Sequence, residues 1–108
     1  MLFRSLAQDT ETVFMDEPTT YLDVRHQLEV MSVSRRLADM GRAVVLVLHD
    51  LPLALRAADR LAVLADGALC QVGTPEEIFT GGELDRAFGV TVQRVRTENG
   101  WLYYCRET

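Results

Sequence analysis

Two short apolar runs, each ending in polar side chains, constrain the fold of this chain most. "TVFM" at 12–15 runs into Asp16 and Glu17, and "AVVLVL" at 43–48 runs into His49. Apolar runs of this length are typical of strands that are buried on both faces. Because an unpaired buried charge is costly, we expect the polar residues to lie at the rim of the sheet, where the strands end.

A helix is predicted between the two runs. From Val24 to Met40 apolar side chains recur at helical spacing, with Asp23 placed to cap the start and Gly41 to end the helix. Two adjacent rows are expected to face the core: Val24, Leu28 and Met31, then Val30, Val33, Leu37 and Met40. Opposite charges four residues apart suit the exposed face: Arg25 with Glu29, and Arg35 with Asp39.

The rest of the chain predicts further short elements. The first are a helix at 51–58 capped by Asp50 and two strands, 60–65 and 68–73, joined by Asp66–Gly67. They are followed by a helix start at 74–79, with Thr74 as N-cap and Glu77 at N3, a helix at 81–89 and a hairpin around "TENG". The alternation predicts an α/β layer with parallel strands and a small β-rich tail. We expect one partial domain over 1–108, divided into an α/β part (1–65) and a carboxyl-terminal part (66–108).

Asp16, Glu17 and His49 follow predicted parallel strands at their carboxyl ends, where ligands gather in such sheets. An aspartate at this place can hold the Mg²⁺ that bridges nucleotide phosphates. The adjacent glutamate can orient or activate a water, and a histidine on the neighbouring strand can reach the same γ-phosphate. The alternative is structural: Asp16 and Glu17 cap a turn at Pro18, and His49 is an ordinary strand-end residue.

Composition narrows the class of protein. The net charge is −5, which disfavours a nucleic-acid partner. No stretch approaches the roughly 20 apolar residues of a membrane span. Two isolated cysteines, Cys70 and Cys105, fit a reducing cytosol, so we expect a cytoplasmic location. All 11 basic residues are arginine, and the chain has no lysine.

The segment "VFMDEPTTYLD" (13–23) resembles the Walker B motif and D-loop of an ABC transporter ATP-binding subunit. "VVLVLHDL" (44–51) is similar to the H-loop strand of that family, and 58–80 to the segment that follows it. The resemblance runs from about Leu6 to about Val92. It is closest to the importers of iron-siderophore, haem and cobalamin type, and it implies the carboxyl-terminal half of a P-loop NTPase layer.

The resemblance also implies roles for single residues. Glu17 would be the general base for the attacking water, and His49 the histidine that senses the γ-phosphate. Asp16 would serve the Mg²⁺ through water. Tyr21, Leu22 and Asp23 would form the D-loop, which touches the partner subunit of a dimer. The other partners implied are a membrane permease and, indirectly, a substrate-binding protein, with the subunit peripheral on the inner face of the membrane.

The same family needs a phosphate-binding loop with a lysine, G-x-x-x-x-G-K-[ST], and this chain has no lysine. Residues 1–8 resemble the end of the helix that follows the family's signature motif. We therefore expect weak or absent binding of ATP and Mg²⁺, and no hydrolysis, by the chain alone. The strand that leads to the phosphate loop would lie between 43–48 and 60–65. Without it these strands pair directly, or another chain fills the gap, or the fold is marginal.

Two functions from different classes follow. The first is the ATP-hydrolysing subunit of an importer, represented by its carboxyl-terminal half. The alternative is a non-catalytic interaction module that docks on a full-length ATPase subunit or a permease. The tail carries Trp101, Tyr103 and Tyr104, which either pack on the core or form a docking face.

Overall fold

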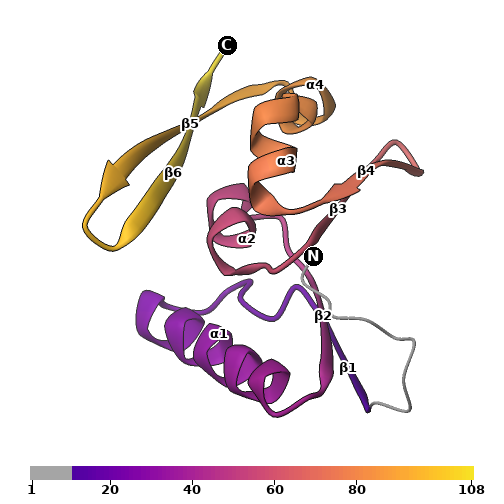
Figure 1. The fold of residues 1–108 in the computed structure, drawn as a ribbon, viewed down its shortest axis with the longest axis vertical. Helices are drawn as coiled ribbons and strands as arrows, with labels where there is room; N and C mark the ends of the chain where they lie inside the picture. The colour runs from indigo at the N-terminus through magenta and orange to yellow at the C-terminus, as the bar shows by residue number, and fades with distance from the viewer. Residues whose placement is uncertain (1–10) are drawn as a thin grey trace.

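The computed structural model describes residues 11–108 (Figure 1). The elements in chain order are β1 (Thr12–Asp16), α1 (Val24–Asp39), β2 (Ala43–Val47), α2 (Leu51–Ala57), β3 (Leu61–Ala65), β4 (Ala68–Gly73), α3 (Pro75–Gly81), α4 (Glu83–Phe88), β5 (Val90–Thr97) and β6 (Gly100–Glu107). Every helix and strand expected over this range is present, close to its predicted bounds. The predicted helix end at 1–8 lies outside the described residues. Among the described helices, none is long and apolar enough to cross a bilayer.

The strands form three separate two-stranded sheets. β1 and β2 are parallel, as predicted, whereas β3 pairs antiparallel with β4, and β5 with β6. The expected parallel layer therefore ends at β2, and the direct pairing of β2 with β3 considered above does not occur. In Figure 1, β1, β2 and α1 lie together at one end, α2 lies in the middle, and the β5–β6 hairpin lies with α3 and α4 at the other end.

The edge of β2 that faces away from β1 has no strand partner among the described residues. Ala43 N–H donates to the Glu11 carbonyl, and Glu17 N–H donates to the Val47 carbonyl. Since hydrogen-bonding residues alternate along a parallel strand, the backbone groups of Val44 and Leu46 point to the open edge. Both residues are fully buried. Buried backbone groups are normally paired, so this edge has the character of an interior strand.

The buried core lies where α2, α3 and α4 meet β2, β3 and the terminal hairpin. Its members include Val44, Leu46, Ala54, Leu55, Leu61, Val63, Ile78, Leu84, Val92 and Tyr103. Leu46 and Ile78 are completely buried and are the largest of the fully buried side chains. The core thus joins the carboxyl-terminal elements to β2, the strand that leads to His49.

The packing of α1 and β1 corrects two predictions. Ser34 and Ala38 are the buried residues of α1, and the apolar rows expected to face the core leave Val24, Leu28 and Met40 exposed. β1 was expected to be buried on both faces, but its side chains alternate and Phe14 is 62% exposed. The physical reason is the same for both elements. β1 has β2 as its strand partner and α1 contacts β2, and no further layer among the described residues covers the outer faces of β1 and α1.

Local signals in the carboxyl-terminal part are confirmed. Asp66 and Gly67 both have positive φ, as a tight hairpin turn between β3 and β4 requires. Thr74 and Glu77 form a reciprocal capping box at the start of α3. The predicted ion pairs on α1 are also formed: 3.5 Å separates Arg25 from Glu29, and 3.8 Å separates Arg35 from Asp39.

Candidate active site at the ends of β1 and β2

The parallel pairing of β1 and β2 brings the predicted polar residues to one edge. Asp16 lies opposite Val47 in the register, and Glu17 follows it immediately. The Glu17 N–H donates to the Val47 carbonyl at 2.8 Å, so the backbone of Glu17 is fixed to the end of β2. Glu17 has a φ of 50°, in the left-handed region that a side chain with a Cβ rarely adopts. This turn directs the Glu17 side chain toward β2.

The carboxylate of Glu17 contacts the imidazole of His49, through Oε1 and Nε2. The pair is accessible: the His49 side chain is 75% exposed and that of Glu17 is 38% exposed. Thr20 adds a hydroxyl that donates to the other oxygen of Glu17 at 3.4 Å. The structure therefore joins two of the predicted site residues and adds Thr20, which sequence reasoning missed. Its position three residues after Glu17, beyond a proline, was the available signal.

Asp16 lies at the same edge but does not join this pair. It is exposed, and its side chain has no hydrogen bond or ion pair within residues 11–108. The structural alternative, in which both carboxylates cap the turn at Pro18, holds only in part: Glu17 accepts from Thr20 across that turn, but it also contacts His49, and Asp16 makes no such bond within residues 11–108. Glu17 and His49 thus form a pair, and Asp16 is a free carboxylate beside it.

An open cavity of about 410 Å³ adjoins the pair. Its lining includes Glu17, Thr19, Thr20, Gln27, His49 and Asp50. The lining is mainly polar and combines carboxylates, hydroxyls and an imidazole. Such a cavity suits a polar ligand or an ordered water rather than an apolar one.

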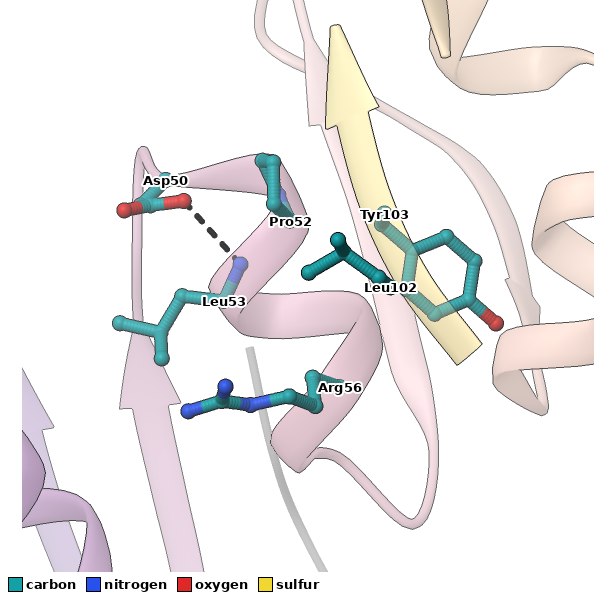
Figure 2. Close-up of a pocket in the computed structure, with 6 residues that line it drawn as sticks. All are labelled: Asp50, Pro52, Leu53, Arg56, Leu102 and Tyr103. Carbon is teal, nitrogen blue, oxygen red and sulfur yellow. Dashed lines mark hydrogen bonds between the residues drawn. The ribbon is translucent and has the colours of Figure 1, made fainter. Parts of the chain in front are cut away.

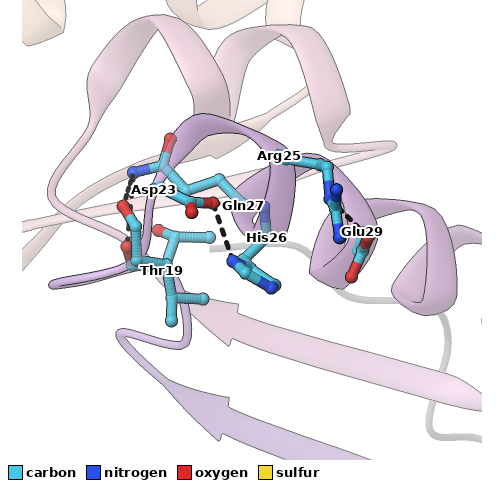
Figure 3. A network of polar contacts seen from close by, with 7 residues as sticks. Thr19, Asp23, Arg25, His26, Gln27 and Glu29 are labelled. Atoms are coloured by element: carbon cyan, nitrogen blue, oxygen red, sulfur yellow. Dashed lines mark hydrogen bonds and ion pairs between the residues drawn. The ribbon is translucent and has the colours of Figure 1, made fainter.

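The predicted D-loop residues 21–23 form a constrained loop between β1 and α1. Tyr21 has a φ of 67°, and its side chain is fully exposed. Figure 3 shows Asp23 beside His26, where one carboxylate oxygen accepts from the His26 N–H at 2.9 Å and contacts Nδ1 at 2.7 Å. Asp23 is thereby the N-cap of α1, as predicted. The Tyr21 side chain lines the open cavity beside Glu17 and is not buried by any of the described residues.

Gln27 holds this loop from the first turn of α1. Its side-chain amide donates to the Leu22 carbonyl at 3.1 Å and to the Thr19 carbonyl at 3.4 Å (Figure 3). Gln27 also lines the cavity beside Glu17, so the residue that holds the loop and the Glu17–His49 pair border the same cavity. Sequence reasoning did not identify Gln27, since nothing in its local pattern separates it from other polar helix residues.

The side chains present do not make a complete Mg²⁺–nucleotide site. Within the described residues no group of three or more histidine, cysteine, aspartate or glutamate side chains is arranged to hold a metal ion. The chain also has no lysine for the β- and γ-phosphates. Two carboxylates without a compensating cradle of cations and N–H groups repel a triphosphate. The described residues at this edge thus offer a carboxylate and an imidazole in contact, beside a second carboxylate, without a lysine near them.

Comparison with known proteins places these features in context. A hemin import ATP-binding protein from Thermobifida fusca is 44% identical over 95 residues, covering 88% of this chain. A petrobactin import ATP-binding protein from Bacillus anthracis is 44% identical over 89 residues, and a cobalamin import ATP-binding protein from Halobacterium salinarum is 44% identical over 93. No family model matches the chain. The chain spans about a third of the length of its first curated relatives, 34% for the Thermobifida protein.

Solved structures show the same fold. A metal-chelate type ABC transporter in an inward-facing conformation matches 91% of this chain with a TM-score of 0.73 and 21% identity, over 40% of its own chain. CbiO1 of Clostridium perfringens, part of the ABC transporter complex CbiONQ, matches 70% of this chain with a TM-score of 0.57 and 26% identity, over 31% of its own chain.

Proposed function

Because the chain belongs to the ATP-binding subunits of ABC importers and matches their carboxyl-terminal part, we propose that it supplies the water-activating half of an ATPase site. Glu17 is the general base that accepts a proton from the attacking water. His49, in contact with Glu17, orients that carboxylate and senses the terminal phosphate. Asp16 is the residue of this chain that serves the metal ion when the rest of the site is supplied.

The observation that carries this proposal is the contact between Glu17 and His49. A general base must lie within reach of the water it activates, and an orienting partner fixes its lone pairs. The contact occurs at the carboxyl ends of parallel strands, beside a polar cavity, and between residues too exposed to be justified by core packing. These features support the proposal that the pair acts on a ligand that enters the cavity.

The assembly in which it acts is part of the same proposal. The solute is an iron chelate, haem or a cobalamin, since relatives that import each of these match the chain. The partners are a membrane permease, a second ATP-binding subunit and, indirectly, a substrate-binding protein. The fully exposed Tyr21 and its loop supply the contact with the second subunit. The subunit then lies on the cytoplasmic face of the membrane, bound to the permease.

A chimera tests the function. The residues that precede the matched segment in the Thermobifida fusca relative are joined to this chain, and Mg·ATP hydrolysis is measured beside the 108-residue chain alone. We expect the chimera to hydrolyse ATP and the chain alone to release no phosphate above background, because it has no lysine for the phosphates. In the chimera, Glu17→Gln should remove turnover while nucleotide binding remains.

Glu29→Gln is the matched control, since Glu29 pairs with Arg25 on the exposed face of α1 and should leave turnover unchanged. Hydrolysis by the isolated chain that Glu17→Gln removes would show that the site is complete without added residues. A chimera that is folded and binds ATP yet turns over equally well with Glu17→Gln would contradict the assignment of the base. A folded chimera with no turnover would contradict the ATPase function itself.

A further inference from the structure

The terminal hairpin meets the helix that follows His49. α2 begins two residues after His49, and β6 runs beside it (Figure 2). A small cavity of about 180 Å³ lies between them, lined by Asp50, Pro52, Leu53, Arg56, Leu102 and Tyr103. Figure 2 shows the Leu102 side chain pointing from β6 toward the first turn of α2, while the Tyr103 ring points away from it. The hairpin and the segment after His49 are therefore packed against each other.

Asp50 belongs to both cavities. It lines the space beside Leu102 and also the polar cavity that contains Glu17 and His49. It is the N-cap of α2: its side chain accepts from the Leu53 N–H at 3.0 Å, and its carbonyl accepts from the Ala54 N–H at 3.0 Å. A displacement of the first turn of α2 therefore also moves Asp50, which follows His49 directly in the chain.

α2 needs an external support because it has only seven residues, too few to be stable alone. Ala54 and Leu55 anchor one side of it in the core. Before α2 in the chain, the hydrogen bonds that join β1 to β2 end at the Val47 carbonyl. Leu48 and His49 bridge the interval between Val47 and Asp50, so the placement of α2 decides where His49 lies.

The hairpin is well placed to give this support because it is itself fixed. Tyr103 packs edge-to-face on Phe79 of α3, with ring centroids 5.7 Å apart. Arg94 of β5 bonds to Glu76 of α3 through both terminal nitrogens. Cys105 in β6 agrees with this placement of the hairpin near α2: partial desolvation raises the pKa of its exposed thiol, and the negative charges of Asp50 and Asp85 raise that pKa further.

We propose that Leu102 is a positioning residue: by holding the first turn of α2 it fixes Asp50, and through Asp50 it holds His49 against Glu17. The terminal hairpin is then a support of the candidate active site, about fifty residues along the chain from His49 and joined to it through α2. The inference rests on the proposed function for the meaning of the pair, but the contact itself can be measured without turnover.

Nuclear magnetic resonance of the histidine rings of the 108-residue chain tests this. The chain has two histidines, so His26 on α1 serves as an internal reference for His49. Glu17→Gln should displace the His49 ring signals in the otherwise unchanged chain, because it removes a charged contact. In a Leu102→Ala background we expect most of that displacement to be lost, with the His26 signals unmoved.

Leu64→Ala is the matched control, because Leu64 and Leu102 are both strand leucines that are 52% exposed, and Leu64 lines neither cavity. It should leave the response of His49 to Glu17→Gln intact. Leu102→Val, which keeps most of the side-chain volume, should give a smaller effect in the same direction and serves if Leu102→Ala does not fold. An unchanged response of His49 in both Leu102 variants, or an equal movement of His26, would overturn the proposal. Neither result bears on whether the chimera hydrolyses ATP.

Discussion

Glu17 contacts His49 from a backbone conformation that glutamate rarely adopts, with a φ of 50° and its N–H bonded to the Val47 carbonyl. Positive φ in a residue with a Cβ costs about 1–2 kcal/mol. Strain of this kind persists where the surrounding structure imposes it, and it is concentrated at functional sites. The contact with His49 therefore costs conformational energy at the Glu17 backbone, and this cost can be measured as a change in the free energy of unfolding.

Glu17→Gly and Glu17→Ala separate the backbone from the side chain. Both variants lose the contact with His49, but only glycine removes the Cβ that disfavours positive φ. We expect Glu17→Gly to be more stable than Glu17→Ala by about 1 kcal/mol in the free energy of unfolding in urea. Val13→Gly and Val13→Ala in β1 provide the comparison at an ordinary strand position, where alanine should be the more stable. The same order at both positions would mean that Glu17 is not strained.

Short-range rules predicted much of this structure because the interactions behind them span only a few residues. Asp23, Asp50 and Thr74 are N-caps as expected, each accepting a backbone hydrogen bond from three residues ahead. The Asp66–Gly67 turn is equally local. The meeting of Glu17 with His49 followed from one longer-range rule, that parallel strands end at the same edge of a sheet.

What failed depended on neighbours that a single sequence does not specify. The apolar rows of α1 marked a face to be covered, but whether a covering layer is present depends on other elements, and Val24 and Met40 are exposed. The third strand was assigned to the parallel layer, but among the described residues it pairs with β4 alone, in the hairpin that Asp66–Gly67 predicted, and does not join β1 and β2. The position of Leu102 beside α2 depends on how the hairpin packs, for which the sequence carries no local signal.

The open edge of β2 predicts a pattern of amide hydrogen exchange. The N–H groups of Val44 and Leu46 point away from β1 and have no hydrogen bond within residues 11–108, whereas that of Val45 points to β1. We expect Val44 and Leu46 to exchange faster than Val45 in the 108-residue chain, despite their burial. In the chimera with the preceding residues of the Thermobifida relative, a strand added to this edge should slow both. Equal protection of all three amides in the chain alone would show that the edge is already paired.

The capping box of α3 predicts how stability changes with pH. The Thr74 N–H donates to the Glu77 carboxylate at 3.0 Å, and this bond, with that to the Thr74 hydroxyl, lowers the pKa of Glu77 below its ordinary value of 4.5. A depressed pKa means that the folded chain binds fewer protons than the unfolded chain in this range. Its contribution to stability is therefore fully present above pH 4.5 and is lost as the pH falls through the lowered value.

Urea unfolding at a series of pH values measures this contribution. Glu77→Gln should flatten the fall in stability below pH 4.5 relative to the unaltered chain. Thr74→Ala should cost about 1 kcal/mol near neutral pH, because it removes the N-cap, while Thr74→Ser should keep the cap. If the free energy of unfolding falls equally with pH in Glu77→Gln and in the unaltered chain, the Glu77 carboxylate does not contribute to the loss of stability in acid.

Arg94 links the hairpin to α3 and predicts an optical signal. Its guanidinium lies 4.0 Å from the centre of the Trp101 ring and 4.2 Å from that of Phe79, and it also pairs with Glu76, whose pKa it lowers. A cation stacked between two rings is attracted by both ring faces. Trp101 is the only tryptophan of the chain, so its fluorescence reports the surroundings of this ring, to which Arg96 also contributes from 5.2 Å.

Arg94→Met should therefore shift the emission of Trp101 and lower the thermal midpoint of unfolding, because it removes both the stacked charge and the pair with Glu76. Arg94→Lys keeps a positive charge but not the planar stack. Its thermal midpoint should therefore fall between those of the unaltered chain and Arg94→Met. Arg36→Met on α1, where Arg36 lies on an exposed face, is the control and should leave the emission unchanged. If Arg94→Met changes neither the emission nor the midpoint, the stack does not hold the hairpin, and its other contacts, such as that of Tyr103 with Phe79, must fix it beside α2.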